Sequence, residues 1–294
     1  MDNMTAKVSC FARAYHYRNN SSWIFKDEHA GLLLGEEEYD AIALNMAGGI
    51  QFFSPGFKGT GEEALAFIVE HQLSPSVLGR SAFNETHLAN EIRLGAGQYI
   101  IFASGYDTYA YRNDCTGIKV FELDLPQMIE EKLNREKCMY GLKPYNRTMV
   151  PCNLEKEDWK YLLEKAGYEK DKKTYGSLLG ISYYLDKESF AGLIGNISDI
   201  MPEGSAICFD YQSDYESEVT RRNEMLAEGA GEQMRAKYTE SEIVHMLSEK
   251  GFLIYEHLDP EEMTKQYFGA YNKATGKKMC APAGVEYVLA VKKK

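Results

Sequence analysis

The chain has 294 residues, 44% of them hydrophobic, which is enough for a sizeable core in one large α/β domain or two small ones. Its formal net charge of −11 argues against nucleic acid as a partner, because binding phosphates takes clustered Lys and Arg. The one basic run, 292–294, is interpreted as a solvated tail. Residues 1–10 hold no long apolar region, and no run approaches the roughly 20 apolar residues that a membrane span needs, so no membrane partner is expected.

The six cysteines are far apart and form no Cys-x-x-Cys pair, which predicts neither a disulfide framework nor a zinc site. Cys208 lies in an apolar, strand-like run, where a reduced and buried thiol is expected. The six histidines show no HxH or HxxxH spacing, so no metal site is predicted. These features together predict a reduced, cytoplasmic protein.

No repeat, low-complexity tract or Pro-rich linker divides the sequence, so we predict a single domain over residues 1–294. Residues 1–96 are predicted to form a mainly helical cap. Ser74-Pro75 begins one predicted helix, and the residues at 84–87 begin another that ends at the glycine-containing stretch 95–97.

From residue 97 the pattern changes to a core of short strands that alternate with helices, which predicts a doubly wound, mostly parallel sheet of α/β class. The predicted strands are 99–104, 119–123, 147–152, part of 174–185, 205–211, 252–257 and 285–292. The predicted helices lie near 126–140, 155–166, 187–199 and 240–250, with capping residues at Asp186 and Thr239. The last two strands are separated by about 30 residues without strong helix periodicity, which favours an antiparallel final hairpin.

A strand, a glycine turn and an acid at the end of the next strand suggest a nucleoside site. The apolar run 99–103 ends at a turn that contains Gly105, and the strand at 119–123 is followed by Asp124. Glycine allows a ligand to approach the backbone closely, and a carboxylate on the neighbouring strand can accept hydrogen bonds from both ribose hydroxyls. By itself this pattern also fits an ordinary strand and turn of an α/β sheet.

The turn holds Gly105 alone, so the three-glycine dinucleotide fingerprint is absent. A pyrophosphate needs several close backbone N–H groups, whereas a ligand without phosphate does not. S-adenosylmethionine, a nucleoside joined to a charged amino acid, is such a ligand.

Two longer motifs resemble those of a known family. The run GYDTYAYR at 105–112 resembles the G-x-D-T-R-x-x-R signature of the leucine carboxyl methyltransferase family, which also includes bacterial polyketide-type O-methyltransferases. The run VFELDLP at 120–126 resembles that family's second-strand motif, F-E-V-D-x-P. The two motifs together are specific, and the resemblance covers roughly residues 10–210 clearly and the remainder loosely. It implies a class I methyltransferase fold: a Rossmann-like, seven-stranded, mostly parallel sheet with an antiparallel final hairpin and an N-terminal helical cap.

Further matches follow in the family's order. Each of them is a short segment that resembles one of the family's: Arg13-Ala14 in the first helix, LGRS at 78–81, VPCNL at 150–154 and YYL at 183–185. The resemblance implies how S-adenosylmethionine binds. Arg80 and Arg13 would contact its methionine carboxylate, and Gly105 would lie under the cofactor. Asp124 would bind the ribose, and Asn153 and Leu154 would lie beside the adenine.

The sequence departs from the family pattern at three positions. Asn153 stands where the family has an acid, and an amide can still accept one hydrogen bond without carrying charge. Leu179 stands where the family has a glutamate that faces the cofactor and the substrate. Tyr109 replaces the arginine of D-T-R.

Several other residues have both a functional and a structural interpretation. Tyr184 and Tyr211 lie at predicted strand ends and are candidate substrate contacts, although most tyrosines only pack half-buried. Asp107 and Arg112 are expected to pair with each other or to cap backbone groups. His16 could serve as a base or be an ordinary helix residue. The charged segment 213–237 is predicted to be a solvated helical insertion, with a lid over the acceptor as the alternative.

The leading hypothesis is an S-adenosylmethionine-dependent methyltransferase that methylates oxygen, in a carboxylate or a hydroxyl group, on a small acceptor molecule. A carboxylate needs no general base, and no strong candidate for a base is found, which favours a carboxylate or another ionised acceptor. The alternative is a protein that binds S-adenosylmethionine without transferase activity and acts through protein association. A nicotinamide-dependent oxidoreductase is a third, disfavoured by the single glycine.

Overall fold

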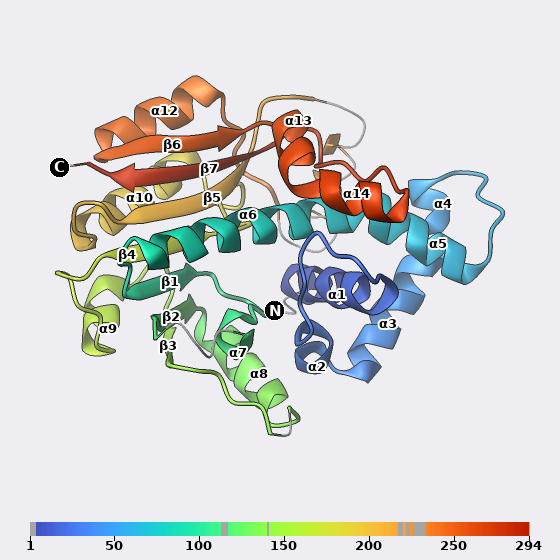
Figure 1. The fold of residues 1–294 in the computed structure, drawn as a ribbon, viewed down its shortest axis with the longest axis horizontal. Coiled ribbons are helices and arrows are strands. Elements are labelled where there is room, and N and C mark those ends of the chain that lie inside the picture. Colours follow the sequence, from blue (N-terminus) through green and yellow to red (C-terminus); the bar gives the residue numbers. More distant parts are fainter. Residues whose placement is uncertain are drawn as a thin grey trace.

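A seven-stranded mixed sheet forms the centre of the molecule in the computed structural model, which describes residues 4–112, 117–139, 141–216, 220–221, 224–225, 228 and 233–293 (Figure 1). The strand order is β3-β2-β1-β4-β5-β7-β6. The strands are β1 Gln98–Phe102, β2 Lys119–Asp124, β3 Arg147–Pro151, β4 Thr174–Leu178, β5 Ala206–Gln212, β6 Phe252–Leu258 and β7 Val285–Lys292. The first five are parallel, and β7 lies antiparallel between β5 and β6.

The sheet reverses its direction of growth at β1. From β1 the chain adds β2 and then β3 on one side, and it then crosses to place β4 and β5 on the other. All five residues of β1 are buried, as expected for a central strand covered on both faces. In such sheets ligands bind outside the carboxyl ends of the strands at this switch point, here next to β1 and β4.

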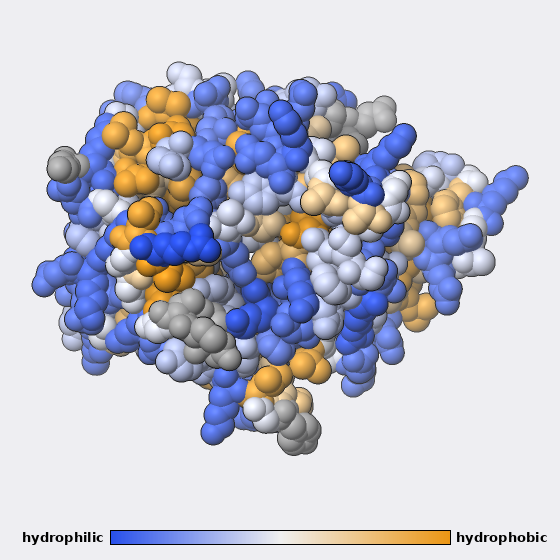
Figure 2. Space-filling view, viewed as in Figure 1, coloured by the Kyte–Doolittle hydropathy of each residue, from blue (hydrophilic) through white to orange (hydrophobic). Residues whose placement is uncertain are grey.

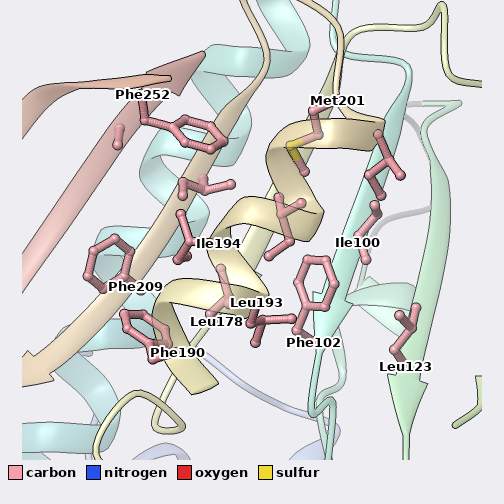
Figure 3. Close-up of a cluster of buried hydrophobic side chains, with 14 of the residues drawn as sticks. Ile100, Phe102, Leu123, Leu178, Phe190, Leu193, Ile194, Met201, Phe209 and Phe252 are labelled. Carbon is pink, nitrogen blue, oxygen red and sulfur yellow. The ribbon is translucent and has the colours of Figure 1, made fainter. Parts of the chain in front are cut away.

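One face of the sheet is covered by α9 Trp159–Lys165, α10 Lys187–Ile200 and α12 Glu240–Glu249. Figure 3 shows Phe190, Leu193 and Ile194 of α10 in the cluster of side chains that also includes Ile100 and Phe102 of β1. Capping residues set where these helices begin. The Asp186 side chain accepts a hydrogen bond from the Ser189 N–H, and Thr239 forms a capping box at the start of α12.

The other face is covered by one long helix and by the segment before the last strand. α6 Ser74–Arg93 crosses the sheet in Figure 1, with α13 Pro260–Met263, η2 Thr264–Phe268 and α14 Gly269–Thr275 beside it. Phe83 and Leu88 of α6 pack with Tyr99 of β1 and with Phe268. This hydrophobic cluster fixes α6 against β1, β4 and β5.

The N-terminal helices form a separate cluster at the carboxyl end of the sheet. They are α1 Met4–Asn19, α2 Ala30–Leu34, α3 Glu36–Gly48, α4 Ile50–Phe53, α5 Gly61–Ile68 and η1 Val69–Leu73. Phe11 and Leu33 pack with Tyr106, which follows β1, and with Met128 of α8 Pro126–Glu136. The short α7 Tyr109–Arg112 lies between β1 and α8 in sequence. The cap is therefore joined to the sheet at the turn after β1.

The fold class predicted from the sequence is confirmed, including the antiparallel final strands. One local prediction is wrong. Residues 74–93 form one helix and not two, because the polar residues at 84–87 lie mid-helix, where Asn84 and His87 are buried. The strand predicted in part of 174–185 is β4, which ends at Leu178, and the helix predicted near 155–166 is α9, which begins at Trp159.

The segment between β6 and β7 also differs from the prediction, because α13, η2 and α14 occupy it. These helices are short and one is a π-helix, so the spacing of their buried residues does not produce a clear α-helical period. The predicted insertion at 213–237 falls in part on residues outside those described.

Among the described residues, no helix is both long enough and apolar enough to cross a membrane. The face in Figure 2 is largely hydrophilic, with hydrophobic residues gathered at the upper left, over β6 and α12. The exposed large hydrophobic residues of those two elements are Val244, Leu253 and Tyr255.

Candidate active site

A cavity of about 460 Å³ opens at the carboxyl ends of β1 to β4, at the switch point of the sheet. Its lining includes every cofactor contact that the family resemblance implied: Arg13, Arg80, Gly105, Asp124, Asn153 and Leu154. We call the part lined by Gly105, Asp124, Asn153 and Leu154 the β2 side, and the part lined by Arg13, Arg80 and Gly180 the α6 side. Cavities of this size hold molecules as large as a nucleoside with an amino-acid tail.

Asp124 on the β2 side is tied to the turn after β1. The Gly105 N–H donates to Asp124 Oδ2 and the Leu125 N–H donates to Asp124 Oδ1, each at 2.7 Å. A carboxylate oxygen has two lone pairs, so each oxygen can accept one further hydrogen bond. Burial raises the pKa of Asp124, and the two N–H groups lower it in part.

The turn after β1 has an unusual backbone. Gly105 has φ +48°, and a Cβ placed there would lie 3.4 Å from the Ala6 Cβ of α1. Ala103, two residues earlier, has φ +53°, in the left-handed region that disfavours residues with a Cβ. Backbone strain of this kind is concentrated at binding sites, and here it marks a position that the sequence analysis did not single out.

Asn153 and Leu154 follow β3 and are half-buried in the cavity wall. Asn153 Oδ1 accepts a hydrogen bond from the Glu155 N–H at 3.0 Å, and the Asn153 N–H donates to Glu157 Oε2 at 3.1 Å. The amide oxygen keeps a second lone pair, so it can still accept one hydrogen bond from a ligand.

Arg80 of α6 reaches the α6 side of the cavity, and its side chain is 13% exposed. Its Nη1 donates to the Tyr183 hydroxyl at 3.1 Å, and its Nη2 donates to Ser9 Oγ at 3.3 Å. Both partners are neutral. The charge of Arg80 is therefore balanced within the described residues only by Asp210, at 3.7 Å from Nη1.

Arg13 of α1 lines the same side but has a different set of partners. Its Nε donates to Asp27 Oδ2 at 2.8 Å, and its Nη2 donates to the Tyr106 carbonyl at 2.6 Å. Asp27 is fully buried and also accepts from Thr108 Oγ1 at 2.7 Å. Arg13 therefore connects the cap to the turn after β1, which makes Arg80 the arginine with more capacity for a ligand.

The motif 105–112 has the structural role that was expected, with one difference in partners. Asp107 Oδ1 accepts from the Tyr109 N–H at 2.7 Å, as a backbone cap. Arg112 does not pair with Asp107 but forms two hydrogen bonds to Glu85 of α6, at 2.8 and 2.5 Å. Arg112 also lies 3.6 Å from Asp27, so the motif joins α6, the cap and β1.

The two candidate contacts for the acceptor, Tyr184 and Tyr211, differ in whether they line the cavity. Tyr184 lines the cavity. Tyr211 does not line it: it is fully buried, and its hydroxyl contacts Glu286 Oε2 at 2.5 Å and His257 Nε2 at 3.0 Å. Side chains alternate along β5, so Asp210 faces Arg80 while Tyr211 packs in the cluster on the opposite face of the sheet.

His16 is a structural residue. It is buried, and its Nε2 accepts a hydrogen bond from the Ile24 N–H at 3.0 Å. Burial lowers its pKa to about 4, so the ring is neutral at physiological pH. It is not part of the cavity lining.

Comparison with known proteins gives a consistent result. A model of the leucine carboxyl methyltransferase family matches residues 6–198. This chain belongs to that family. It is 35% identical over 303 residues to a Bacillus subtilis (strain 168) protein named "Putative S-adenosyl-L-methionine-dependent methyltransferase YktD", with 99% of this chain and 98% of that protein covered.

Solved structures show the same fold. A DUF574 family protein from Streptomyces avermitilis superposes with a TM-score of 0.61 at 13% identity, covering 98% of this chain and 97% of the other. A protein from Thermobifida fusca, described as a "putative methyltransferase", gives a TM-score of 0.51 at 14% identity, with 86% and 95% covered. The predicted family, the class of enzyme and the S-adenosylmethionine cofactor are confirmed.

Sequence reasoning missed three residues that shape the cavity: Ala103, Asp27 and Asp210. Asp27 and Asp210 contact Arg112 and Arg80, which lie far away in the sequence, so no local motif marks the two acids. The Ala103 backbone conformation has no local signal either, because alanine normally avoids it.

Proposed function

We propose that this methyltransferase transfers the methyl group to an oxygen atom of a small acceptor, and that this oxygen belongs to a carboxylate. The observation that carries the proposal is the lining of the cavity. Its acidic residues are Asp107, Asp124 and Glu155, and its described residues include no histidine or lysine. Asp107 caps the turn after β1, Asp124 is engaged there too, and Glu155 follows β3, so none of the three lies on the α6 side.

The geometry supports the residue roles that the family resemblance implied. Asp124 has a free lone pair on each oxygen for the two ribose hydroxyls, and Asn153 Oδ1 has one for the adenine amine. Leu154 provides apolar contact beside the adenine. Gly105 would form the turn beneath the nucleoside, where its φ of +48° favours glycine over a residue with a Cβ.

Arg80 would bind the methionine carboxylate, because a guanidinium forms charge-assisted hydrogen bonds with a carboxylate and the other hydrogen-bonding partners of Arg80 are neutral. Arg13 would act mainly by fixing the cap over this site through Asp27. Tyr184 is the candidate contact for the acceptor.

When bound, S-adenosylmethionine supplies a sulfonium methyl group: an acceptor oxygen forms a bond to the methyl carbon as the carbon–sulfur bond breaks, and that electron pair stays on sulfur. The residues of this chain would hold the two reactants in line and exclude water, and such positioning alone can supply much of the rate. A carboxylate acceptor is ionised at neutral pH and needs no base, unlike an alcohol or a phenol.

The proposal is tested with methyl-labelled S-adenosylmethionine and pools of small metabolites that carry carboxylate or phenol groups. Label in a product that mild alkali releases as methanol supports a carboxylate acceptor. Alkali-stable label would show an ether or an amine and would overturn that part of the proposal.

Cofactor binding is measured separately by isothermal titration with S-adenosylhomocysteine and with NAD. Micromolar binding of S-adenosylhomocysteine alone is expected. Binding with no transfer to any acceptor would favour the alternative, a protein that acts through association, while preference for NAD would contradict the proposal altogether.

A further inference from the structure

The cavity wall at the end of β4 has an apolar residue next to a buried acid. Leu179 lines the cavity. The sequence pattern of the family has a glutamate at this position. In the register of β4 and β5, Leu178 pairs with Phe209. Leu179, the residue that follows β4, therefore lies beside Asp210 of β5 at the same edge of the sheet.

Asp210 is fully buried, and only part of its hydrogen-bonding capacity is used. Its Oδ1 accepts from the Gly180 N–H at 2.6 Å. Its Oδ2 has no hydrogen-bond partner within the described residues and lies 3.7 Å from Arg80 Nη1. A buried carboxylate is costly unless a cation balances it, and Arg80 is the cation that it faces.

Gly180 brings the two charged groups together. It has φ +71°, and a Cβ at this position would lie between 2.5 and 3.0 Å from three atoms of the Arg80 guanidinium. The guanidinium therefore lies directly against the backbone turn whose Gly180 N–H donates to Asp210. The Tyr183 hydroxyl and Ser9 Oγ accept hydrogen bonds from the Arg80 guanidinium.

We infer that Asp210 is a positioning residue for the amino-acid part of the cofactor: from β5 it supplies the carboxylate that position 179 lacks, and it orients Arg80 through charge and through the Gly180 turn. This inference rests on the proposed role of Arg80. In this arrangement the Arg80 guanidinium would lie between two carboxylates, that of Asp210 and that of the bound ligand.

The test compares two ligands that differ only in the part that Arg80 would bind. S-adenosylhomocysteine carries the amino acid, whereas 5′-methylthioadenosine keeps the nucleoside and the sulfur without it. The variant is Asp210→Asn, whose amide oxygen can still accept from the Gly180 N–H. We expect this variant to lower the affinity for S-adenosylhomocysteine about tenfold or more. The affinity for 5′-methylthioadenosine should change by no more than about twofold.

A second variant moves the carboxylate. Adding Leu179→Glu to Asp210→Asn places an acid directly after the neighbouring strand, β4, and we expect it to recover part of the affinity for S-adenosylhomocysteine. Arg80→Gln should also lower the affinity for S-adenosylhomocysteine more than the affinity for 5′-methylthioadenosine. Its effect should be smaller when Asp210 is already Asn, because the two side chains act as one unit.

The outcomes are distinguishable. Unchanged affinity for S-adenosylhomocysteine in Asp210→Asn, or an equal loss of both ligands with a lower melting temperature, would overturn the inference while leaving the proposed function in place. If Asp210→Asn does not fold, Arg80→Gln decides: equal loss of both ligands overturns the inference. A wild-type protein that binds neither ligand would contradict the proposed function itself.

Discussion

The β2 side and the α6 side of the cavity are built in different ways. The β2 side comes from the turn after β1 and from the carboxyl ends of β2 and β3, which lie within the segment 103–154. The α6 side combines Arg13 of the cap, Arg80 of α6, Gly180 after β4 and, behind them, Asp210 of β5. The first is a local product of neighbouring parallel strands, whereas the second exists only when four distant segments are assembled.

This difference has an energetic consequence. On the β2 side Asp124 is held by backbone N–H groups, which do not depend on any other side chain. On the α6 side the groups are side-chain charges that balance one another, so removing one leaves another buried without its partner. We therefore expect changes on the α6 side to affect stability as well as binding.

The largest expected effect is that of Asp27→Ala, at the junction of the cap with the turn after β1. Asp27 is fully buried and balances both Arg13 and Arg112, so its loss should lower the free energy of unfolding by about 3–5 kcal/mol. Urea denaturation measures this. Asp199→Ala, at a surface ion pair with Lys160, is the control and should change stability by less than about 1 kcal/mol.

Next in size is Asp124→Ala on the β2 side. Losing the acceptor of two ribose hydroxyls should weaken S-adenosylhomocysteine and 5′-methylthioadenosine equally, by about 100-fold. Isothermal titration with both ligands measures it, and Glu155→Ala, an exposed residue of the same wall, should leave both affinities nearly unchanged. A loss confined to S-adenosylhomocysteine would contradict the assignment of this side to the nucleoside.

The cap should also make the protein sensitive to acid. Burial lowers the pKa of His16 to about 4, against an ordinary value near 6.5, so the unfolded chain takes up this proton first. The stabilising contribution of neutral His16 is complete above pH 6.5 and is lost as the pH falls toward 4. It amounts to about 3 kcal/mol at most.

Denaturation curves at several pH values test this. His16→Gln should flatten the decline between pH 6.5 and 4, whereas His245→Gln, an exposed histidine, should leave it as it is. His87, whose pKa burial also lowers to about 4, should leave a residual decline in the His16 variant.

The smallest expected effect is that of Ala103→Gly in the turn after β1. Glycine tolerates φ +53° without the clash of a Cβ, so the gain in the folded state should slightly exceed the entropy cost in the unfolded chain. Thermal denaturation should show stabilisation of about 0.5 kcal/mol. Ala110→Gly in α7 is the matched control and should destabilise by about 1 kcal/mol.

Sequence reasoning was most reliable where the signal is local. The run 99–103 and the acid at 124 predicted two neighbouring parallel strands and a carboxylate at their shared edge, and the structure has β1, β2 and Asp124 in that arrangement. It failed for α13, η2 and α14, whose short and irregular turns carry no clear period. It also failed for Tyr211, because a strand end does not say which face a side chain takes.

By itself, the sequence determined the family, the doubly wound sheet and the turn that places Gly105 beside Asp124. Strand periodicity and turn chemistry depend on neighbouring residues, so the sequence shows them directly. Only the tertiary structure decided which buried charges balance one another. Asp27 and Arg112, like Asp210 and Arg80, are brought together by the packing of the cap, α6, α7 and β5, and no local pattern encodes such a pairing. Burial makes each pairing obligatory, because a charge removed from water needs a partner at short range.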